Sequence, residues 1–166
     1  MWWSDRRGAL GLIAAAPTLA ACGFRPAAGP GSPAADLAGA VRMAAPDDRD
    51  SFDLVARLED RLGRPGAPRY RLDYSIETSR RTAGVTAAQE VTRYSISGTA
   101  RYTLTEIGAE APLAQGEVTS FTSYSAAGST LSTATAREDA RRRLMVILAD
   151  RIVTRLTGEL AAEGAG

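Results

Sequence analysis

The sequence lacks histidine, lysine and asparagine altogether, and cysteine occurs once, as Cys22. A zinc site built on histidine and cysteine is thereby excluded, as is catalysis by a histidine base or a histidine-containing triad. No glycine-rich phosphate loop of either common pattern occurs, and no spacing of Asp and Glu pairs two carboxylates in an obvious cleft. The sequence therefore predicts a protein that is not an enzyme and that holds no metal or cofactor.

The charge is balanced. All 20 basic residues are arginines, against 19 acidic ones; two of the former and one of the latter lie in residues 1–21, so 18 of each sign follow them. Without a global positive field, we expect no binding to nucleic acid. The 145 residues that remain of the 166 after residue 21 are enough for one domain with a real core.

The start of the chain is typical of a secretory signal peptide over residues 1–21. Arg6 and Arg7 precede a short apolar stretch, and small residues precede Cys22. The apolar stretch is shorter than the about 20 residues that a membrane-spanning helix needs, and a lone cysteine forms no internal disulfide. Two other interpretations remain open, a buried core cysteine that happens to follow an apolar run and an uncleaved signal anchor.

The tetrapeptide Leu19-Ala20-Ala21-Cys22 resembles the lipobox of bacterial lipoprotein precursors. The resemblance implies a diacylglycerol thioether on Cys22, cleavage before it, and an acyl chain such as palmitate on the new amino terminus. Two or three chains anchor a protein stably where one is marginal. In lipoproteins of this type an aspartate after the cysteine tends to retain the protein at the inner membrane, so Gly23 favours the outer membrane.

The segment after Cys22 is rich in Pro, Gly and Ala, and it predicts a flexible tether over residues 22–36. A weak strand signal follows over residues 40–44, with Val41 and Met43 on one face; a loop is the alternative. A helix is predicted over residues 50–62, with Asp50 as N-cap and Gly63 ending it. Its apolar stripe consists of Leu54, Val55, Leu58 and Leu62.

Alternation of apolar and polar residues predicts strands over residues 70–78, 94–105 and about 117–125. Turn or loop segments are predicted between them, around residues 80–88 and over 108–116. Gly98 falls on the apolar face of the second strand, which suggests a bend, a bulge or a close approach. The third strand carries Val118, Phe121 and Tyr124, an imperfect alternation that indicates a bulge or a two-sided environment.

A long final helix is predicted over residues 134–160, with Arg143, Asp150 and Thr154 facing away from its apolar stripe. The stripe consists of Met145, Leu148, Ala149, Ile152 and Leu156. Together these elements predict an α+β domain over residues 37–162, a two-layer sandwich with both helices on one face of a mostly antiparallel sheet. Residues 163–166 are predicted to be a disordered tail.

The other face of the sheet is predicted to be rich in hydroxyl groups. Along the longest strand it carries Ser95, Ser97, Thr99, Thr103 and Thr105. Such a face suits enclosure against another polar wall, where charges would cost more to desolvate. It is equally compatible with an ordinary exposed face, since threonine favours strands.

The motif Cys22-Gly23-Phe24 and the order of elements behind it resemble the lipopolysaccharide-assembly lipoproteins of the outer membrane (LptE-like), over nearly the whole of residues 22–160. The resemblance implies two helices on one face of a four-stranded sheet. It also implies an outer-membrane lipoprotein, facing the periplasm or a barrel lumen. Such a protein assists assembly of, and plugs, the β-barrel that inserts lipopolysaccharide. Expected partners are that barrel, lipopolysaccharide and, through the lipid anchor, the membrane.

Family members that bind lipopolysaccharide use basic residues in a strand–strand loop and before the last helix. Here Arg80 and Arg81 lie near the first place, and Arg137 and Arg141 near the second, without a position-by-position match. Guanidinium groups suit phosphates, but each could equally be a solvated arginine. The alternative function is a periplasm-facing binding module for a small lipid or peptide, which predicts an apolar cavity between helices and sheet.

Overall fold

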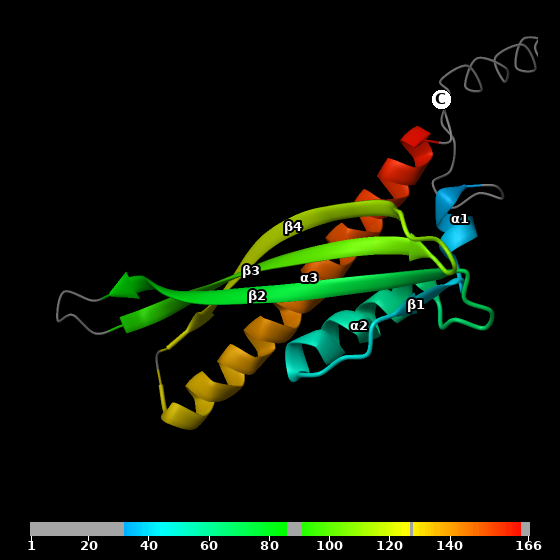
Figure 1. The fold of residues 1–166 in the computed structure, drawn as a ribbon. Coiled ribbons are helices and arrows are strands. Elements are labelled where there is room, and N and C mark those ends of the chain that lie inside the picture. The colour runs from blue at the N-terminus through cyan, green and yellow to red at the C-terminus, as the bar shows by residue number, and fades with distance from the viewer. Residues whose placement is uncertain (1–31, 86–90, 127, 164–166) are drawn as a thin grey trace, which may run out of the picture.

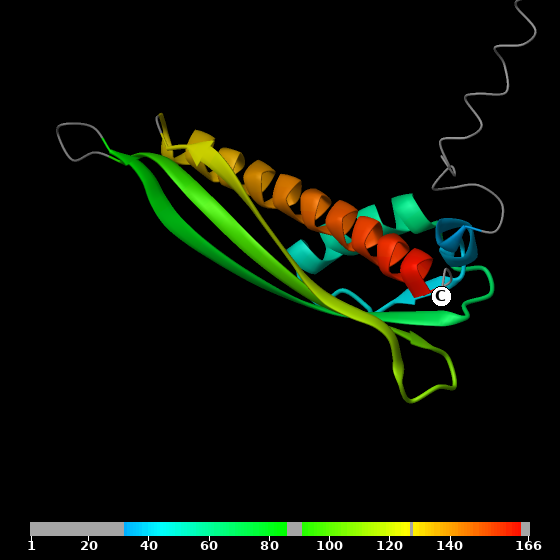
Figure 2. The ribbon, with the colours of Figure 1, turned by 90° about the horizontal axis from the view of Figure 1, so that it is seen from above.

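The protein folds as a four-stranded sheet with two main helices on one face (Figures 1 and 2). The computed structural model describes residues 32–85, 91–126 and 128–163. Its elements are α1 (Pro33–Leu37), β1 (Val41–Met43), α2 (Arg49–Leu62), β2 (Tyr70–Val85), β3 (Val91–Glu106), β4 (Pro112–Ser125) and α3 (Thr130–Glu163). The strand order is β1-β2-β3-β4, with β1 parallel to β2 and the other pairs antiparallel. The predicted α+β fold is confirmed.

The ends of the chain carry several predictions that the structure does not reach. The signal peptide, Cys22 and most of the tether lie outside the described residues. From Ser32 onward the chain is described, and it contains α1, a helix that the tether prediction lacked. Ser32 caps α1 by accepting a hydrogen bond from Ala35 N–H at 3.3 Å, and Leu37 is buried in the core. At the other end α3 extends to Glu163, the first residue of the predicted tail, while residues 164–166 lie outside the described part.

The N-cap of helix α2 lies two residues earlier in the chain than predicted. Its N-cap is Asp48, which accepts a hydrogen bond from Ser51 N–H at 2.7 Å, while Ser51 Oγ accepts one from Asp48 N–H at 2.9 Å. This capping box satisfies two backbone donors at once, and it lowers the pKa of the Asp48 carboxyl, mainly through the Ser51 backbone N–H. The prediction of Asp50 as N-cap is wrong, because Asp50 lies inside the helix and is buried. Gly63 ends the helix with a φ of 79°, as predicted.

Strands β2 and β4 are longer than predicted. The predicted turn around residues 80–88 is wrong over its first part, because β2 runs on to Val85 and pairs with β3 as far as Val91; residues 86–90 lie outside the described ranges. The predicted loop over 108–116 is likewise too long, because β4 begins at Pro112, beside a register shift at Thr105. An irregularity on an edge strand is where a proline is tolerated, since it donates no ladder hydrogen bond.

Strand β4 alternates between two environments, as its imperfect pattern predicted. Val118 and Tyr124 are buried beneath the helices, whereas Phe121 is 73% exposed on the opposite face. In register it lies opposite Ser97 of β3, one of the hydroxyl-bearing residues. Phe121 therefore belongs to the open face, whereas Val118 and Tyr124 belong to the covered face.

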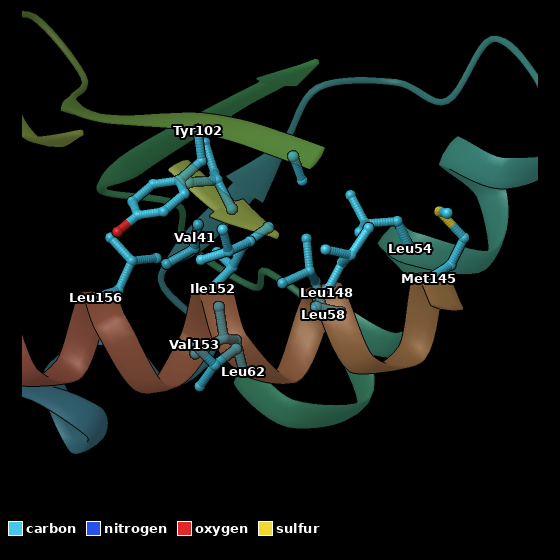
Figure 3. Packing of buried hydrophobic residues seen from close by; sticks show 14 of the residues in the cluster. Val41, Leu54, Leu58, Leu62, Tyr102, Met145, Leu148, Ile152, Val153 and Leu156 are labelled. Atoms are coloured by element: carbon cyan, nitrogen blue, oxygen red, sulfur yellow. The ribbon is translucent and has the colours of Figure 1, made fainter. Parts of the chain in front are cut away.

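The core fills the space between α2, α3 and the covered face of the sheet (Figure 3). Every residue of the two predicted helical stripes is buried. Side chains of α3 lie close against Gly98 of β3, because a Cβ built there would lie 3.0 Å from Leu144 Cδ2 and 3.1 Å from Leu148 Cδ1. The predicted close approach at Gly98 is confirmed, and the helix can lie against the strand only because this side chain is absent. None of the helices in the described residues is long and apolar enough to cross a membrane.

Gly158 is a second glycine with a testable consequence. It lies inside α3, is exposed, and has no atom within 4 Å of the position that a Cβ would take. Gly158→Ala should therefore raise the free energy of unfolding by about 0.5–1 kcal/mol, since glycine lowers helix stability by that amount relative to alanine. Chemical denaturation measures the gain, and an unchanged or lower midpoint would contradict the open environment.

Candidate functional site

Strands β2 and β3 continue past the helices as a two-stranded arm, which we define as residues 78–85 and 91–97. Figures 1 and 2 show the arm projecting at the end of the molecule opposite α1. From Glu77 to Ala83 every side chain of β2 is exposed, whichever face of the strand it occupies. Neither face of this part of β2 is therefore covered by a helix.

Three exposed arginines lie on the arm, Arg80, Arg81 and Arg93. None of them forms an ion pair within residues 32–85, 91–126 and 128–163. The guanidinium carbon of Arg80 lies 4.8 Å from the ring centroid of Tyr94, which stacks on Tyr124 at 5.4 Å. This cation–π contact orients Arg80 without neutralising it. Among the described residues, these three cations therefore have no carboxylate partner and can bind an anion.

Arg141, one of the predicted binding residues, forms an ion pair with Asp50. Its Nε lies 3.1 Å from both carboxylate oxygens of Asp50, and Nη2 lies 2.5 Å from Oδ2. The hydrogen bonds from Arg141 to Asp50 raise the pKa of the guanidinium. The Asp50 side chain is only 8% exposed, so this ion pair joins the start of α2 to α3 in a largely enclosed place. The guanidinium is therefore already engaged by a carboxylate.

Arg137 is exposed and lines a groove of about 350 Å³ between the start of α2 and α3. Asp48, Asp53 and Glu138 line the same groove, so its charge is mixed. The four predicted binding residues thus fall into two groups, Arg80 and Arg81 on the arm, and Arg137 and Arg141 on α3. No hydrogen bond or ion pair joins the two groups in the described residues, although α3 begins toward the end of the molecule from which the arm projects (Figure 1).

Arg93 is the arm residue that the sequence analysis missed. It begins the alternation of β3 one residue before Tyr94, and it shares the strand face of Ser95. Arg81 lies opposite Ser95 in the register of β2 and β3. The pattern of alternation, extended by one residue, would have placed Arg93 on the same face as Arg81.

The open face of the sheet is polar and rich in hydroxyl groups, as predicted. At its centre Arg101 pairs with Glu77 and Glu117, each at 2.8 Å, so the positive charge of Arg101 is offset and the three groups together carry one net negative charge. Around them the face carries mostly hydroxyl side chains of β3 and β4, and Ser79 bonds Ser97 at 2.8 Å. Such a surface can rest against another polar wall at a smaller desolvation cost than one carrying unpaired charges.

Arginines of α3 close the outer edge of β4. Arg155 Nη1 donates to the carbonyl of Glu117 at 3.1 Å, Arg143 Nη2 donates to that of Ser123 at 3.5 Å, and Arg151 donates to that of Thr119. A groove of about 590 Å³ lies along this contact. The side chains occupy acceptors that an added strand would need.

Tyr102 provides a pH-dependent test of the covered face. Its hydroxyl is buried and donates to Glu159 at 3.3 Å; burial, and then the Glu159 charge, raise the pKa of Tyr102 to about 12. The folded state thus favours the neutral phenol, a contribution to stability that is complete below pH 10 and is lost as pH rises toward 12. Wild type should lose on the order of 2 kcal/mol between pH 10 and 12 through this group. Tyr102→Phe should remove that loss, which denaturation at a series of alkaline pH values measures; equal losses would contradict it.

The sequence of this domain matches that of a known family. Residues 38–156 match the family model described as LptE, lipopolysaccharide-assembly. The chain belongs to the lipopolysaccharide-assembly (LptE) family. No curated protein sequence is detectably similar to it.

Solved structures share the LptE fold seen here. A Caulobacter crescentus CB15 protein classed as a lipoprotein is 22% identical, with a TM-score of 0.65 over 79% of this chain and 96% of its own. The rare lipoprotein B of Shewanella oneidensis is 15% identical, with a TM-score of 0.56 over 75% and 97%. A lipoprotein B of Nitrosomonas europaea is 12% identical, with a TM-score of 0.56 over 74% and 84%. At these identities the likeness concerns the fold.

Membership of the LptE family implies a role in lipopolysaccharide assembly, and the family consists of assembly proteins rather than enzymes. Within the described ranges no group of three or more acidic or cysteine side chains is placed to hold a metal ion.

Proposed function

We propose that the protein is an outer-membrane lipoprotein, anchored through Cys22, that assists assembly of, and plugs, the β-barrel inserting lipopolysaccharide. In this proposal the arm contacts lipopolysaccharide phosphates through Arg80, Arg81 and Arg93. The observation that carries it is the set of three arginines on the arm that form no ion pair with any described residue, since guanidinium groups pair with phosphate in a geometry that ammonium groups cannot match.

The position of the arm supports this assignment. The anchored terminus leads into α1, at the end of the sheet where β1 lies (Figure 1). Strand β2 has 16 residues, and at about 3.3 Å per residue it spans about 50 Å. A domain held near the membrane at its α1 end therefore carries the arm arginines far from the anchor.

The open face supports the barrel part of the proposal. Its hydroxyl side chains and its ion-paired Arg101 suit a polar lumen, since the interior of large outer-membrane barrels is polar. The exposed Phe121 provides an apolar contact on that face. A binding module for a small lipid is less well supported. It requires an apolar cavity, whereas the leucines between the helices and the sheet are fully buried against one another.

The lipopolysaccharide contact is tested by binding of the purified full-length chain, in mild detergent, to lipopolysaccharide and to its dephosphorylated form. The variant Arg80→Gln/Arg81→Gln/Arg93→Gln should bind lipopolysaccharide at least tenfold more weakly than wild type. The matched control is Arg42→Gln/Arg64→Gln/Arg71→Gln, which removes three exposed arginines at the β1 end and should bind as wild type does. Equal losses in both variants, or equal binding of the dephosphorylated form by wild type, would contradict the arm site.

The barrel contact is tested by purification from mild-detergent extracts at native expression, followed by mass spectrometry, with wild type and Cys22→Ala compared. We expect a large outer-membrane barrel protein to accompany the wild-type chain. We also expect acyl chains on Cys22 of the wild-type chain, and none on the Cys22→Ala chain. Recovery of the wild-type chain without a barrel protein would count against the plug.

A further inference from the structure

The three arginines of the arm do not share one face of its two strands. In the register of β2 and β3, Arg80 lies opposite Ile96, a residue of the covered face that is 4% exposed. Arg81 lies opposite Ser95, on the open face. Residues directly opposite each other in an antiparallel pair project to the same side of the sheet. Arg80 therefore projects to the side of the sheet that the helices occupy, and Arg81 projects to the other side.

Arg81 and Arg93 form a pair on the open face. Arg93 shares the strand face of Ser95, which lies opposite Arg81, so the two arginines are diagonal neighbours on adjacent strands. Diagonal neighbours lie about 7–8 Å apart, which is within reach of long side chains. Two guanidinium groups at this spacing can converge on one phosphate group, which also offsets their mutual repulsion.

Arg80 is held toward β3 by an aromatic ring. Its guanidinium carbon lies 4.8 Å from the ring centroid of Tyr94, which is two residues along β3 from Ile96. Tyr94 in turn lies directly opposite Tyr124 of β4, with the two ring centroids 5.4 Å apart and an angle of 28° between the ring planes. Tyr124 is only 5% exposed. The ring beneath Arg80 is thus itself held by a buried neighbour.

The contact with Tyr94 prepares Arg80 for an anion. A ring face attracts the cation through its quadrupole and provides no oxygen for the N–H groups, so the guanidinium can still offer them to a phosphate group. An arginine side chain that is already ordered also loses less conformational entropy on binding. Because Tyr94 lies on the inner strand β3, the contact keeps Arg80 away from the outer edge of β2, around which it could otherwise approach Arg81.

We propose that the arm holds two separate phosphate subsites, one on each face: Arg80, positioned by Tyr94, and the pair of Arg81 and Arg93. The backbone of β2 and β3 lies between the subsites, so one phosphate group cannot contact both. The arm therefore suits a ligand that carries more than one phosphate group. This inference rests on the proposed function, because it assigns roles within the site proposed there. Tyr94 is a positioning residue in it and acts on the ligand only through Arg80.

The role of Tyr94 is tested by binding of lipopolysaccharide to the purified full-length chain in mild detergent. Tyr94→Leu should weaken binding about three- to tenfold, within the range of one cation–π contact, and as much as Arg80→Gln does. Tyr94→Phe keeps the ring face, so it should bind as wild type does. In the Arg80→Gln chain, Tyr94→Leu should have no further effect, whereas an effect through loosened packing on Tyr124 would persist there.

The separation of the subsites is tested by combining variants. Arg80→Gln and Arg81→Gln remove groups from different subsites, so their fold-losses in affinity should multiply. Arg81→Gln and Arg93→Gln remove two groups from one subsite, so the loss in the double variant should differ about threefold or more from the product of the single losses. Melting curves show whether each variant is folded.

Failure of this inference and failure of the proposed function give different results. If wild type binds the dephosphorylated form equally well, both fail. If wild type prefers the phosphorylated form but Tyr94→Leu binds as wild type does, or loses affinity equally in the Arg80→Gln chain, this inference alone is overturned. Coupling of Arg81 with Arg80 as strong as its coupling with Arg93 would likewise overturn the two subsites.

Discussion

Arg141→Met is expected to lower the free energy of unfolding by about 2 kcal/mol. Removing the guanidinium leaves the Asp50 carboxylate, 8% exposed, without its counter-ion inside the domain. Loss of one partner from a fully buried pair costs about 3–5 kcal/mol, and the smaller figure reflects the 43% exposure of the Arg141 side chain. Chemical denaturation at neutral pH measures the change.

The matched control is Arg142→Met, which removes the same group one position along α3. Among the described residues Arg142 pairs only with Asp139, three residues earlier on the same helix, and both are about half exposed. Such surface pairs contribute about 0–1 kcal/mol, so the control should lie close to wild type. Equal losses in the two variants would show that the Asp50 contact is not what stabilises the domain.

The Arg141→Met variant also tells a structural role of Arg141 from a role in binding lipopolysaccharide. If Arg141 acts through Asp50, folded Arg141→Met binds lipopolysaccharide as wild type does, whereas the triple variant of the arm does not. A specific loss of binding in Arg141→Met, with stability unchanged, would instead support the predicted binding role of Arg141.

Gly98→Val is expected to cost about 3 kcal/mol, or a fall of about 10 °C in the melting temperature. The added Cβ would lie 3.0 Å from Leu144 Cδ2 and 3.1 Å from Leu148 Cδ1, both in fully buried side chains that cannot move aside freely. The strand or the helix would have to shift, and that displaces the packing on either side.

Two controls accompany Gly98→Val. Gly158→Ala tests a glycine with open space around it, and it should stabilise rather than destabilise. Adding Leu144→Ala to Gly98→Val makes room for the new methyl groups, so the double variant should be more stable than the sum of the two single losses implies. Additive losses would mean that the cost at Gly98 does not arise from contact with α3.

Residue periodicity was sufficient to identify the layers of this fold. The stripe around Leu58 and the stripe around Ile152 are apolar at helical spacing, and both are buried as predicted. The alternation through Ile96 and Tyr102 correctly identified the covered face of β3. These patterns are local, because an element that buries one face must repeat its apolar residues with its own period.

Boundaries and ion pairs were predicted less well, because they depend on distant partners. Asp48 and Asp50 are both good N-cap residues, and only the arrival of Arg141 from α3 makes Asp50 the buried one. Residues 80–83 read as a turn in sequence, yet the β3 register continues β2 through them. Propensity yields to strand pairing where a partner strand supplies the hydrogen bonds.

For the candidate site, too, the sequence determined some features and the tertiary structure determined others. The sequence by itself determined which arginines exist near the strand connection and which residues carry hydroxyl groups on the open face. Only the tertiary structure decided that Arg141 is engaged by Asp50, while Arg80, Arg81 and Arg93 form no ion pair within the part of the chain that the structure describes. It also decided that arginines of α3 close the outer edge of β4. The physical reason is that a charge or a backbone group is satisfied by whatever the fold brings beside it, and those neighbours lie tens of residues away in the chain.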